Sequence, residues 1–217
     1  MKLKAVCFDM DGVVVDTMHH HVEAWRYAFN KKGYDHDEHV FYIREGMPGK
    51  KTIKDVFEVF NVDASEEIIE DIYVQKRDYF KKNAQYEFIE ETISTLNLLQ
   101  KHHIPIALVT GSRKEFVAEV LQKLPITFHT IITGDDVKEG KPAPEPYLLA
   151  MEQHPFSPSE WLVIENAPLG IQSAKSAGAY CLAVETTLEQ KYLKGADQIV
   201  ESKDLERTVE SLLKGVE

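Results

Sequence analysis

Short apolar runs alternate with helical patterns along most of the chain. Apolar runs of this length are typical of strands that are buried on both faces of a parallel sheet. We predict six such strands, over residues 4–8, 104–109, 130–133, 161–164, 180–184 and 198–200. Helices are predicted over residues 89–102, 115–124, 144–151, 167–177 and 205–213. Strands that alternate with helices indicate an α/β fold with a doubly wound, Rossmann-like parallel sheet.

One long stretch, residues 17–84, breaks this alternation because it contains helical patterns only. Apolar side chains recur at helical spacing around Trp25, over residues 52–60 and over residues 65–81. Residues 13–17 are expected to leave the sheet as a linker. We therefore predict two domains, namely an α/β core of residues 1–16 and 85–217 and an inserted all-helical cap of residues 17–84.

Composition and charge narrow the class of protein. The chain has 217 residues with 43% hydrophobic and 28% charged, which is ordinary for a globular protein. The net charge of −11 argues against nucleic acid as a partner, although a local cation can still attract a small phosphate. Cys7 and Cys181 show no disulfide or metal spacing, which fits a reducing cytoplasm. The first apolar run stops at Asp9 and is too short for a membrane span, so we expect a cytoplasmic protein without a membrane partner.

Polar residues follow the predicted strands, and in a parallel sheet these points meet at one edge, where ligands bind. Two acids only one residue apart, Asp9 and Asp11, need a cation or a shared proton nearby. The groups at this edge are Asp9-Met10-Asp11-Gly12, Thr110-Gly111-Ser112, Lys141 in a proline-rich loop, and Glu165-Asn166.

Each of these groups also allows an ordinary structural interpretation. Ser112 and Glu115 match a capping box, but a helix N-terminus beside a hydroxyl is also a natural anion site. Lys141 is either solvated or a point charge for phosphate. Asn166 is suited to cap the next helix, while Glu165 and Asn166 also offer the oxygen ligands that Mg²⁺ prefers.

Three consecutive histidines, His19, His20 and His21, open the first predicted cap helix. Neighbouring residues on a helix point in different directions, so the three side chains cannot converge on one metal ion. We expect one of them to face a cleft.

The groups at the sheet edge together resemble the haloacid dehalogenase-like superfamily of phosphotransferases, in particular its β-phosphoglucomutase-like branch with a helical cap. The resemblance is carried by Phe8-Asp9-Met10-Asp11-Gly12-Val13, Val109-Thr110-Gly111-Ser112, Gly140-Lys141-Pro142 and Val163-Ile164-Glu165-Asn166. It implies that Asp9 is the nucleophile, which forms an aspartyl-phosphate, and that Asp11 is the general acid and base. It also implies that Thr110 and Lys141 hold the phosphoryl oxygens.

The same resemblance implies a Mg²⁺ cofactor and several substrate contacts. Its implied ligands are the Asp9 carboxylate, the Asp11 backbone carbonyl, Glu165 and Asn166. His21 matches a hinge histidine that assists Asp11, and Lys76 matches a cap lysine that contacts the substrate, although a solvated helix face explains Lys76 equally well. The substrate site implied in this way includes His21, Gly46, Lys76, Gly111 and Ser112.

Two departures from the family pattern bear on the substrate. Asn166 stands where a second acid is usual, and Gly49 stands where the mutases carry an arginine, with Lys50 or Lys51 as substitutes. We hypothesise that Glu45 reaches the Mg²⁺ site when the cap closes and replaces the missing carboxylate. An acid at this position disfavours a second phosphate on the substrate and therefore predicts a compact substrate. The alternative is that Glu45 is a solvated acid of the cap loop.

Three functions remain open from the sequence. The first is a Mg²⁺-dependent phosphohydrolase that acts, as a monomer, on a small phosphorylated metabolite or pyrophosphate. The second is a β-phosphoglucomutase-type sugar-phosphate mutase. The third is a non-catalytic, receiver-like phospho-acceptor module, because receivers also place acids, a hydroxyl and a lysine at strand ends.

Overall fold

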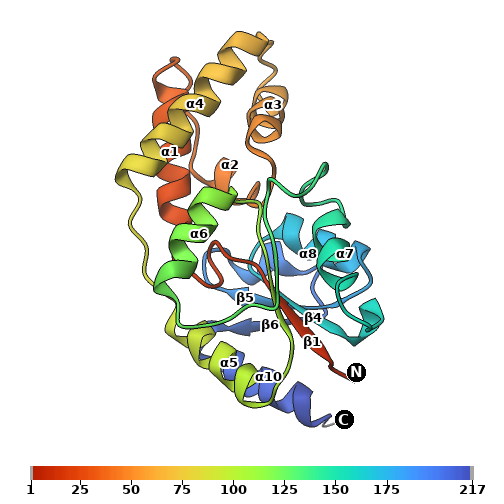
Figure 1. Cartoon of the computed structure of the whole chain (residues 1–217). Coiled ribbons are helices and arrows are strands. Elements are labelled where there is room, and N and C mark those ends of the chain that lie inside the picture. Colours follow the sequence, from red (N-terminus) through yellow and green to blue (C-terminus); the bar gives the residue numbers. More distant parts are fainter. Residues whose placement is uncertain (1, 216–217) are drawn as a thin grey trace.

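The computed structural model of the chain describes residues 2–215 and contains one six-stranded sheet (Figure 1). All neighbouring strands pair in parallel, in the order β3-β2-β1-β4-β5-β6. Their bounds are β1 Ala5–Phe8, β2 Ile106–Val109, β3 Thr130–Ile132, β4 Trp161–Glu165, β5 Tyr180–Glu185 and β6 Gln198–Glu201. The predicted doubly wound α/β fold is confirmed. Because the strand order reverses at β1, the carboxyl end of this strand opens into the crevice where such folds bind ligands.

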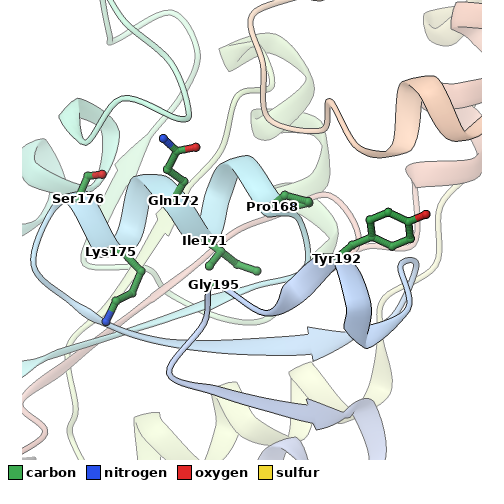
Figure 2. Close-up of a pocket in the computed structure, with 7 residues that line it drawn as sticks. All are labelled: Pro168, Ile171, Gln172, Lys175, Ser176, Tyr192 and Gly195. Carbon is green, nitrogen blue, oxygen red and sulfur yellow. The ribbon is translucent and has the colours of Figure 1, made fainter.

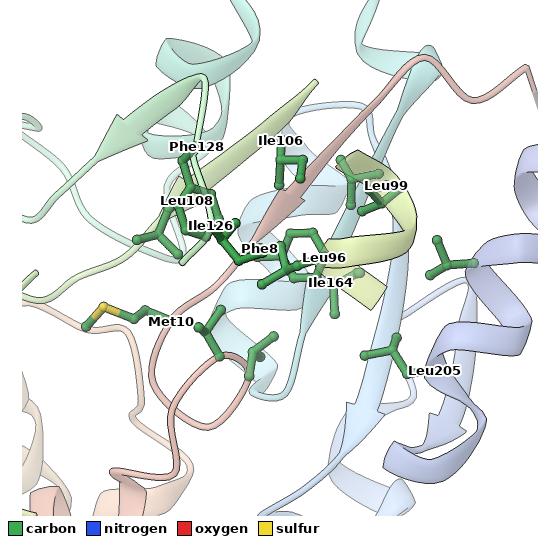
Figure 3. Close-up of a cluster of buried hydrophobic side chains, with 14 of the residues drawn as sticks. Phe8, Met10, Leu96, Leu99, Ile106, Leu108, Ile126, Phe128, Ile164 and Leu205 are labelled. Carbon is green, nitrogen blue, oxygen red and sulfur yellow. The ribbon is translucent and has the colours of Figure 1, made fainter. Parts of the chain in front are cut away.

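Helices cover both faces of the sheet because the side chains of β1 alternate between them. Val6 and Phe8 belong to one buried cluster, and Ala5 and Cys7 belong to the other. The Phe8 cluster is shown in Figure 3. It is covered by α5 Glu90–Lys101, α6 Lys114–Lys123 and α10 Leu205–Lys214. The opposite face is covered by α7 Glu145–Met151, α8 Pro168–Ser176 and α9 Gln190–Leu193.

Four helices between β1 and α5 lie beyond the carboxyl ends of the strands and form the cap (Figure 1). They pack around a third apolar cluster, which includes Trp25, Phe29 and Phe57. Ser65 caps the longest of them, since its hydroxyl accepts the Ile68 amide at 3.3 Å. The cap helices are α1 Met18–Asn30, α2 His39–Tyr42, α3 Gly49–Val59 and α4 Glu66–Asn83.

The two chain segments that join cap and sheet are paired with each other. The amide of Asp16 donates to the Glu87 carbonyl, and the amide of Ile89 donates to the Val14 carbonyl, both at 3.0 Å. The first linker differs from its prediction, because residues 13–15 fold back into the core and are at most 1% exposed. Three valines in a row cannot lie in water at low cost, so the turn is buried.

The sequence pattern missed the two shortest α-helices, α2 and α9. Each has four residues, about one helical turn, which leaves no room for an apolar periodicity to repeat. Among the described residues, no helix is both long and apolar enough to cross a membrane.

Candidate active site

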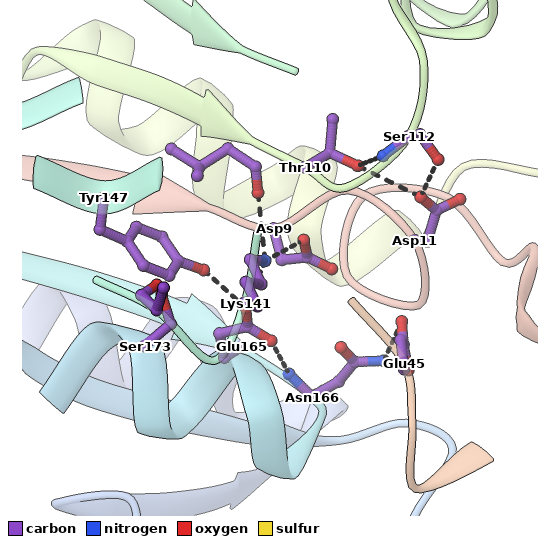
Figure 4. Close-up of polar contacts among 12 residues, drawn as sticks. Asp9, Asp11, Glu45, Thr110, Ser112, Lys141, Tyr147, Glu165, Asn166 and Ser173 are labelled. Carbon is purple, nitrogen blue, oxygen red and sulfur yellow. Dashed lines mark hydrogen bonds and ion pairs between the residues drawn. The ribbon is translucent and has the colours of Figure 1, made fainter. Parts of the chain in front are cut away.

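Asp9 directly follows β1 and forms a buried ion pair with Lys141 (Figure 4). The Lys141 Nζ lies 2.5 Å from Asp9 Oδ1 and 2.6 Å from Glu165 Oε1, and donates a longer bond of 3.3 Å to the Val109 carbonyl. All three residues are at most 5% exposed. The lysine therefore joins the first acid of β1 to the acid at the end of β4.

Burial and charge act in opposite directions on this group. Burial raises the pKa of the Asp9 carboxyl, Lys141 opposes that rise, and the charges of Glu165 and Asp11 add to it. Burial lowers the pKa of Lys141, but Asp9 and Glu165 together raise it above its ordinary value. Lys141 is therefore protonated. The negative charge of the acids around it still exceeds the single positive charge of this lysine.

Asp11 lies among neutral donors. Its Oδ1 accepts the Thr17 hydroxyl at 2.6 Å and lies 3.2 Å from His21 Nε2. Its Oδ2 accepts the hydroxyls of Ser112 at 2.7 Å and Thr110 at 3.3 Å. Burial raises the pKa of Asp11, but the contact with His21 and the hydroxyl bonds outweigh it, so its pKa lies well below the ordinary value. Asp11 is therefore ionised, as a carboxylate.

His21 connects Asp11 to the cap. Its Nδ1 lies 2.8 Å from Lys76 Nζ. Because an ammonium group only donates, Nδ1 is the acceptor and Nε2 carries the proton toward Asp11. The Lys76 ammonium also lies 5.0 Å from the Trp25 ring centroid and 4.9 Å from that of Phe80, and burial lowers its pKa to about 8. The expectation that one of the three histidines faces a cleft is confirmed.

Of the two interpretations that the sequence left open for Ser112 and for Asn166, the helix-capping one does not hold in either case. The hydroxyl of Ser112 bonds Asp11 instead of the helix, and α6 is capped by Asp135, whose Oδ2 accepts the Lys114 amide at 2.9 Å. Asn166 precedes the N-cap position of α8, which Ala167 occupies without a side-chain bond. Ser112 and Asn166 are therefore free for the site.

Glu45, in the loop between α2 and α3, meets Asn166 across the boundary between cap and sheet (Figure 4). Asn166 Nδ2 lies 3.4 Å and 3.3 Å from the two carboxylate oxygens of Glu45. Burial, followed by the charges of Asp9 and Glu165, raises the pKa of Glu45 well above its ordinary value. The structure therefore places Glu45 among the acids of the site, as the sequence hypothesis required, and it is not a solvated loop acid.

A divalent cation fits this group on two counts. Asn166 Oδ1 is buried without a hydrogen-bond partner among the described residues, which is costly for an amide oxygen unless a ligand occupies it. The charges of Asp9, Glu165 and Asp11 also add to the effect of burial and raise the pKa of Glu45 well above its ordinary value, although Lys141 opposes the rise, so this group of acids favours a further cation. Among residues 2–215, no three acid, histidine or cysteine side chains converge by themselves as a metal site, so an amide or carbonyl oxygen is needed to complete one.

The cap loop lies directly on these groups. Gly46 has φ +80°, and an added Cβ would lie 3.0 Å from Lys141 Cδ, so both the backbone and the space favour glycine. A Cβ at Gly111 would lie 3.3 Å from the Gly46 carbonyl. The cavity that remains between cap and sheet measures about 430 Å³ and contains the predicted substrate residues, namely His21, Gly46, Lys76, Gly111 and Ser112.

Comparison with known proteins agrees with this arrangement. The family model of the haloacid dehalogenase-like hydrolases matches residues 6–184. The chain belongs to the haloacid dehalogenase-like hydrolase family. Validoxylamine A 7'-phosphate phosphatase from Streptomyces hygroscopicus subsp. limoneus is 30% identical to it over 206 residues, which cover 93% of this chain and 94% of the relative. The phosphorylated carbohydrates phosphatase of Thermotoga maritima is 30% identical over 182 residues, or 81% of this chain and 82% of the relative.

A solved structure gives the same result for the fold. A Bacteroides vulgatus protein proposed to be a β-phosphoglucomutase superposes with a TM-score of 0.90 at 35% identity, over 100% of this chain and 91% of the other. The protein is thus an enzyme of the phosphatase and phosphomutase branch of the haloacid dehalogenase-like hydrolases, and a non-catalytic receiver-like module is not retained.

Three residues near the site of this hydrolase were missed from the sequence. Thr17 donates to Asp11, and Thr186 donates to the Gly12 carbonyl at 2.7 Å. The Tyr147 hydroxyl donates to Glu165 Oε1 at 2.6 Å. Thr17 and Tyr147 lie close in sequence to predicted motifs, but nothing in a local pattern shows which way a hydroxyl points.

A second hollow is lined by side chains of α8 and of the segment around α9 (Figure 2). It is formed by Pro168, Ile171, Gln172, Lys175, Ser176, Tyr192 and Gly195. Its one charged side chain, Lys175, is already paired with Asp197 at 2.6 Å. This hollow has no reactive group and is not a candidate active site.

Proposed function

We propose that this enzyme is a Mg²⁺-dependent phosphatase that hydrolyses a small phosphorylated metabolite or pyrophosphate through an aspartyl-phosphate on Asp9. The observation that carries the proposal is that Asp9 and Asp11, which are separated by one residue, have different hydrogen-bond partners. Asp9 is bound to a buried lysine, whereas Asp11 is bound by hydroxyls and an imidazole. One acid is thus suited to attack phosphorus and the other to exchange a proton.

In the first step, an Asp9 oxygen attacks the phosphorus atom and the bond to the leaving oxygen breaks. Lys141 holds Asp9 Oδ1, so Oδ2 is the free oxygen for the attack. Asp11 is a carboxylate in the free enzyme, so it first takes a proton from the monoanionic form of the substrate phosphate and then gives that proton to the leaving oxygen. Thr110 and Lys141 hold the phosphoryl oxygens, and Lys141 can exchange its long bond to Val109 for one of them.

In the second step, water hydrolyses the aspartyl-phosphate. Asp11, now a carboxylate, takes a proton from the attacking water, and the bond between Asp9 and phosphorus breaks to release phosphate. The strong donors around Asp11 suit this half of the reaction, because they stabilise the form that acts as a base. The His21–Lys76 contact keeps the imidazole oriented toward Asp11.

Mg²⁺, bound by Asp9, Asn166 Oδ1, the Asp11 backbone carbonyl and Glu45, would supply positive charge beside the transferring group. Aspartate, carbonyl and amide oxygens are ligands that this ion accepts. Glu165 instead accepts hydrogen bonds from Lys141 and Tyr147.

Hydrolysis is favoured over a mutase reaction because, within residues 2–215, Lys76 is the one basic side chain lining the cavity that does not pair with an acid. Among the described residues, its other basic side chains are paired with acids, namely Arg44 with Asp55, Arg77 with Asp78, Lys81 with Glu115 and Arg113 with Asp135. Lys50 pairs with Glu70 and does not line the cavity. A Cβ at Gly49 would lie 2.7 Å from the Tyr73 ring, so an arginine does not fit there either.

Support for the substrate class comes from relatives that are phosphatases for phosphorylated carbohydrates and a phosphorylated validoxylamine. A cavity of about 430 Å³ lies within the usual range for small-molecule sites. Phosphorylated carbohydrates are therefore the first compounds to test, with pyrophosphate beside them because Glu45 disfavours a distant second phosphate. A monomeric state stays a prediction.

The test is a phosphate-release screen over sugar phosphates, other small phosphate monoesters and pyrophosphate, each with Mg²⁺ and with a chelator. We expect Mg²⁺-dependent release of free phosphate. In parallel, phosphorus NMR of a sugar 1-phosphate would show an isomeric sugar phosphate if the enzyme were a mutase. Isomer formation without phosphate release would refute the proposal.

A further inference from the structure

The carboxylate of Glu165 is held on all sides (Figure 4). Its Oε1 accepts hydrogen bonds from Lys141 and Tyr147, each at 2.6 Å, and its Oε2 accepts the Asn166 amide at 3.1 Å. The backbone of α8 closes the remaining side, because a Cβ at Gly170 would lie only 1.9 Å and 2.3 Å from the two carboxylate oxygens. Glu165 is 1% exposed, so no water replaces any of these contacts from the surface.

Tyr147 holds Glu165 from inside the protein. Its side chain is fully buried, and its hydroxyl has Glu165 as its one hydrogen-bond partner among the described residues. Its ring also lies 5.1 Å from Lys141 Nζ, within the range of a cation–π contact. One residue thus contacts both the lysine and the acid that pairs with it.

The position of Lys141 depends on these contacts. An ammonium group has three donors, and those of Lys141 point to Asp9, Glu165 and the Val109 carbonyl. Glu165 is the second acid among these partners, so its carboxylate holds the ammonium at Oδ1 of Asp9. Tyr147 is fully buried, and its contacts with the site run through Glu165 and Lys141.

We propose that Tyr147 is a positioning residue, and that Tyr147 and Glu165 serve to set Lys141 against Asp9, while Glu165 does not bind the cation. The side chains that bind the cation are then Asn166, Asp9 and Glu45. Glu165, the acid at the end of β4, pairs with Lys141 instead. The proposal rests on the proposed function for its kinetic part, but its metal-binding part is measured without a substrate.

The first measurement is Mg²⁺ affinity by titration calorimetry on the substrate-free protein. We expect Tyr147→Phe and Glu165→Gln to bind Mg²⁺ within about twofold of the unaltered protein, since neither change touches a ligand. Asn166→Ala should weaken Mg²⁺ binding by about tenfold or more, as is usual when a metal site is altered. A tenfold loss in Glu165→Gln, or none in Asn166→Ala, would overturn the proposal.

The second measurement separates kcat from KM at saturating Mg²⁺. Tyr147→Phe should lower kcat by about 10–100-fold, the usual effect of losing an outer contact, with little change in KM. Tyr180→Phe is the matched control. Tyr180 is the first residue of β5, at the end of the strand away from the site, and its hydroxyl lies 3.5 Å from Gln198. This variant should keep full activity. Unchanged kcat in Tyr147→Phe would also overturn the proposal.

Folding is checked by the melting temperature of each variant. A structural role alone would lower the melting temperature of Tyr147→Phe and leave kcat of the folded fraction intact, which would contradict the positioning role. If no compound in the screen were hydrolysed, the proposed function would fail, whereas the comparison of Glu165→Gln with Asn166→Ala would still decide which side chain binds Mg²⁺.

Discussion

At the residue scale, the environments of two neighbouring acids follow from the direction in which each side chain leaves the end of β1. Asp9 points to Lys141, which comes from the loop before α7, while Asp11 points to Thr17 and Ser112. Burial raises the pKa of Asp9 although the ammonium of Lys141 opposes that rise, whereas the His21 contact and the hydroxyl bonds lower the pKa of Asp11 in spite of burial. The two acids therefore respond differently to the same substitution.

We expect Asp9→Asn to abolish turnover, because an amide cannot form the aspartyl-phosphate. Asp11→Asn should lower kcat by about 10²–10⁴-fold, the usual contribution of a general acid or base. Phosphate release on the best compound of the screen measures both effects, and a phosphorylated Asp9 trapped in Asp11→Asn would support the order of steps. Near-normal rates in either variant would contradict the assignment.

Glu45→Ala should weaken the apparent affinity for Mg²⁺ by about tenfold, or ~1.4 kcal/mol, because the variant loses a carboxylate that lies against Asn166. The measurement is a Mg²⁺ titration of activity, together with calorimetry on the free protein. Glu58→Ala, an exposed acid of α3, removes the same charge from the cap without touching the site. Equal Mg²⁺ dependence in both variants would exclude Glu45 as a ligand.

Much of the site could be predicted from residues that follow strands, because a parallel sheet brings those positions together. The pairing of Asp9 with Lys141 and the closeness of Glu45 to Asn166 follow from that edge and the cap loop. The Tyr147 contact could not be predicted, because it depends on how α7 packs against β2, β3 and α8 and so brings its tyrosine to the end of β4. Side-chain direction across two elements is a property of packing and leaves no periodic signal in the sequence.

At the element scale, the start of α6 shows how a long-range contact replaces a local one. The sequence offers Ser112 and Glu115 as a capping box, yet Ser112 bonds Asp11 and Glu115 pairs with Lys81 of the cap. Asp135, from the loop after β3, caps the helix instead. The local cap is given up because the hydroxyl has a buried charge to satisfy.

Asp135→Ala should therefore lower the free energy of unfolding by about 1 kcal/mol, the usual cost of losing a helix cap. For a chain of this size that corresponds to a fall of about 2–4 °C in melting temperature. Calorimetry or circular dichroism on heating measures it, with Glu115→Ala as the comparison. A larger loss in Glu115→Ala than in Asp135→Ala would show that the capping box forms after all.

The sequence pattern predicted long elements well and short ones poorly, for a physical reason. A helix such as α4 repeats its apolar face over 18 residues, whereas α2 and α9 are held by contacts of Tyr42 and Tyr192 with the sheet cluster. The buried linker at residues 13–15 is another such case, since its place depends on the space between β1 and the segment that returns from the cap.

At the scale of the whole molecule, cap and sheet touch at separate points around the cavity. Lys81 pairs with Glu115 at 2.8 Å, the Phe80 and Phe116 rings meet edge to face, and His39 lies on Tyr192. Glu45 and Asn166 form a further contact at the centre. The cavity is therefore enclosed by side chains of both parts, and a substrate must enter between them from solvent.

That entry is opposed by the charge of the molecule as a whole. The net charge is −11, and a phosphorylated substrate is also an anion, so the two repel at long range. The screening length falls from about 30 Å at 0.01 M salt to about 8 Å at 0.15 M. We expect kcat/KM to rise a few-fold over that range at saturating Mg²⁺, with kcat unchanged, because screening speeds the encounter and leaves the enclosed chemistry alone. Initial rates at low substrate in sodium chloride and in choline chloride measure this, and a fall of kcat/KM in both salts would mean that local positive charge at the cavity mouth, not net charge, governs entry.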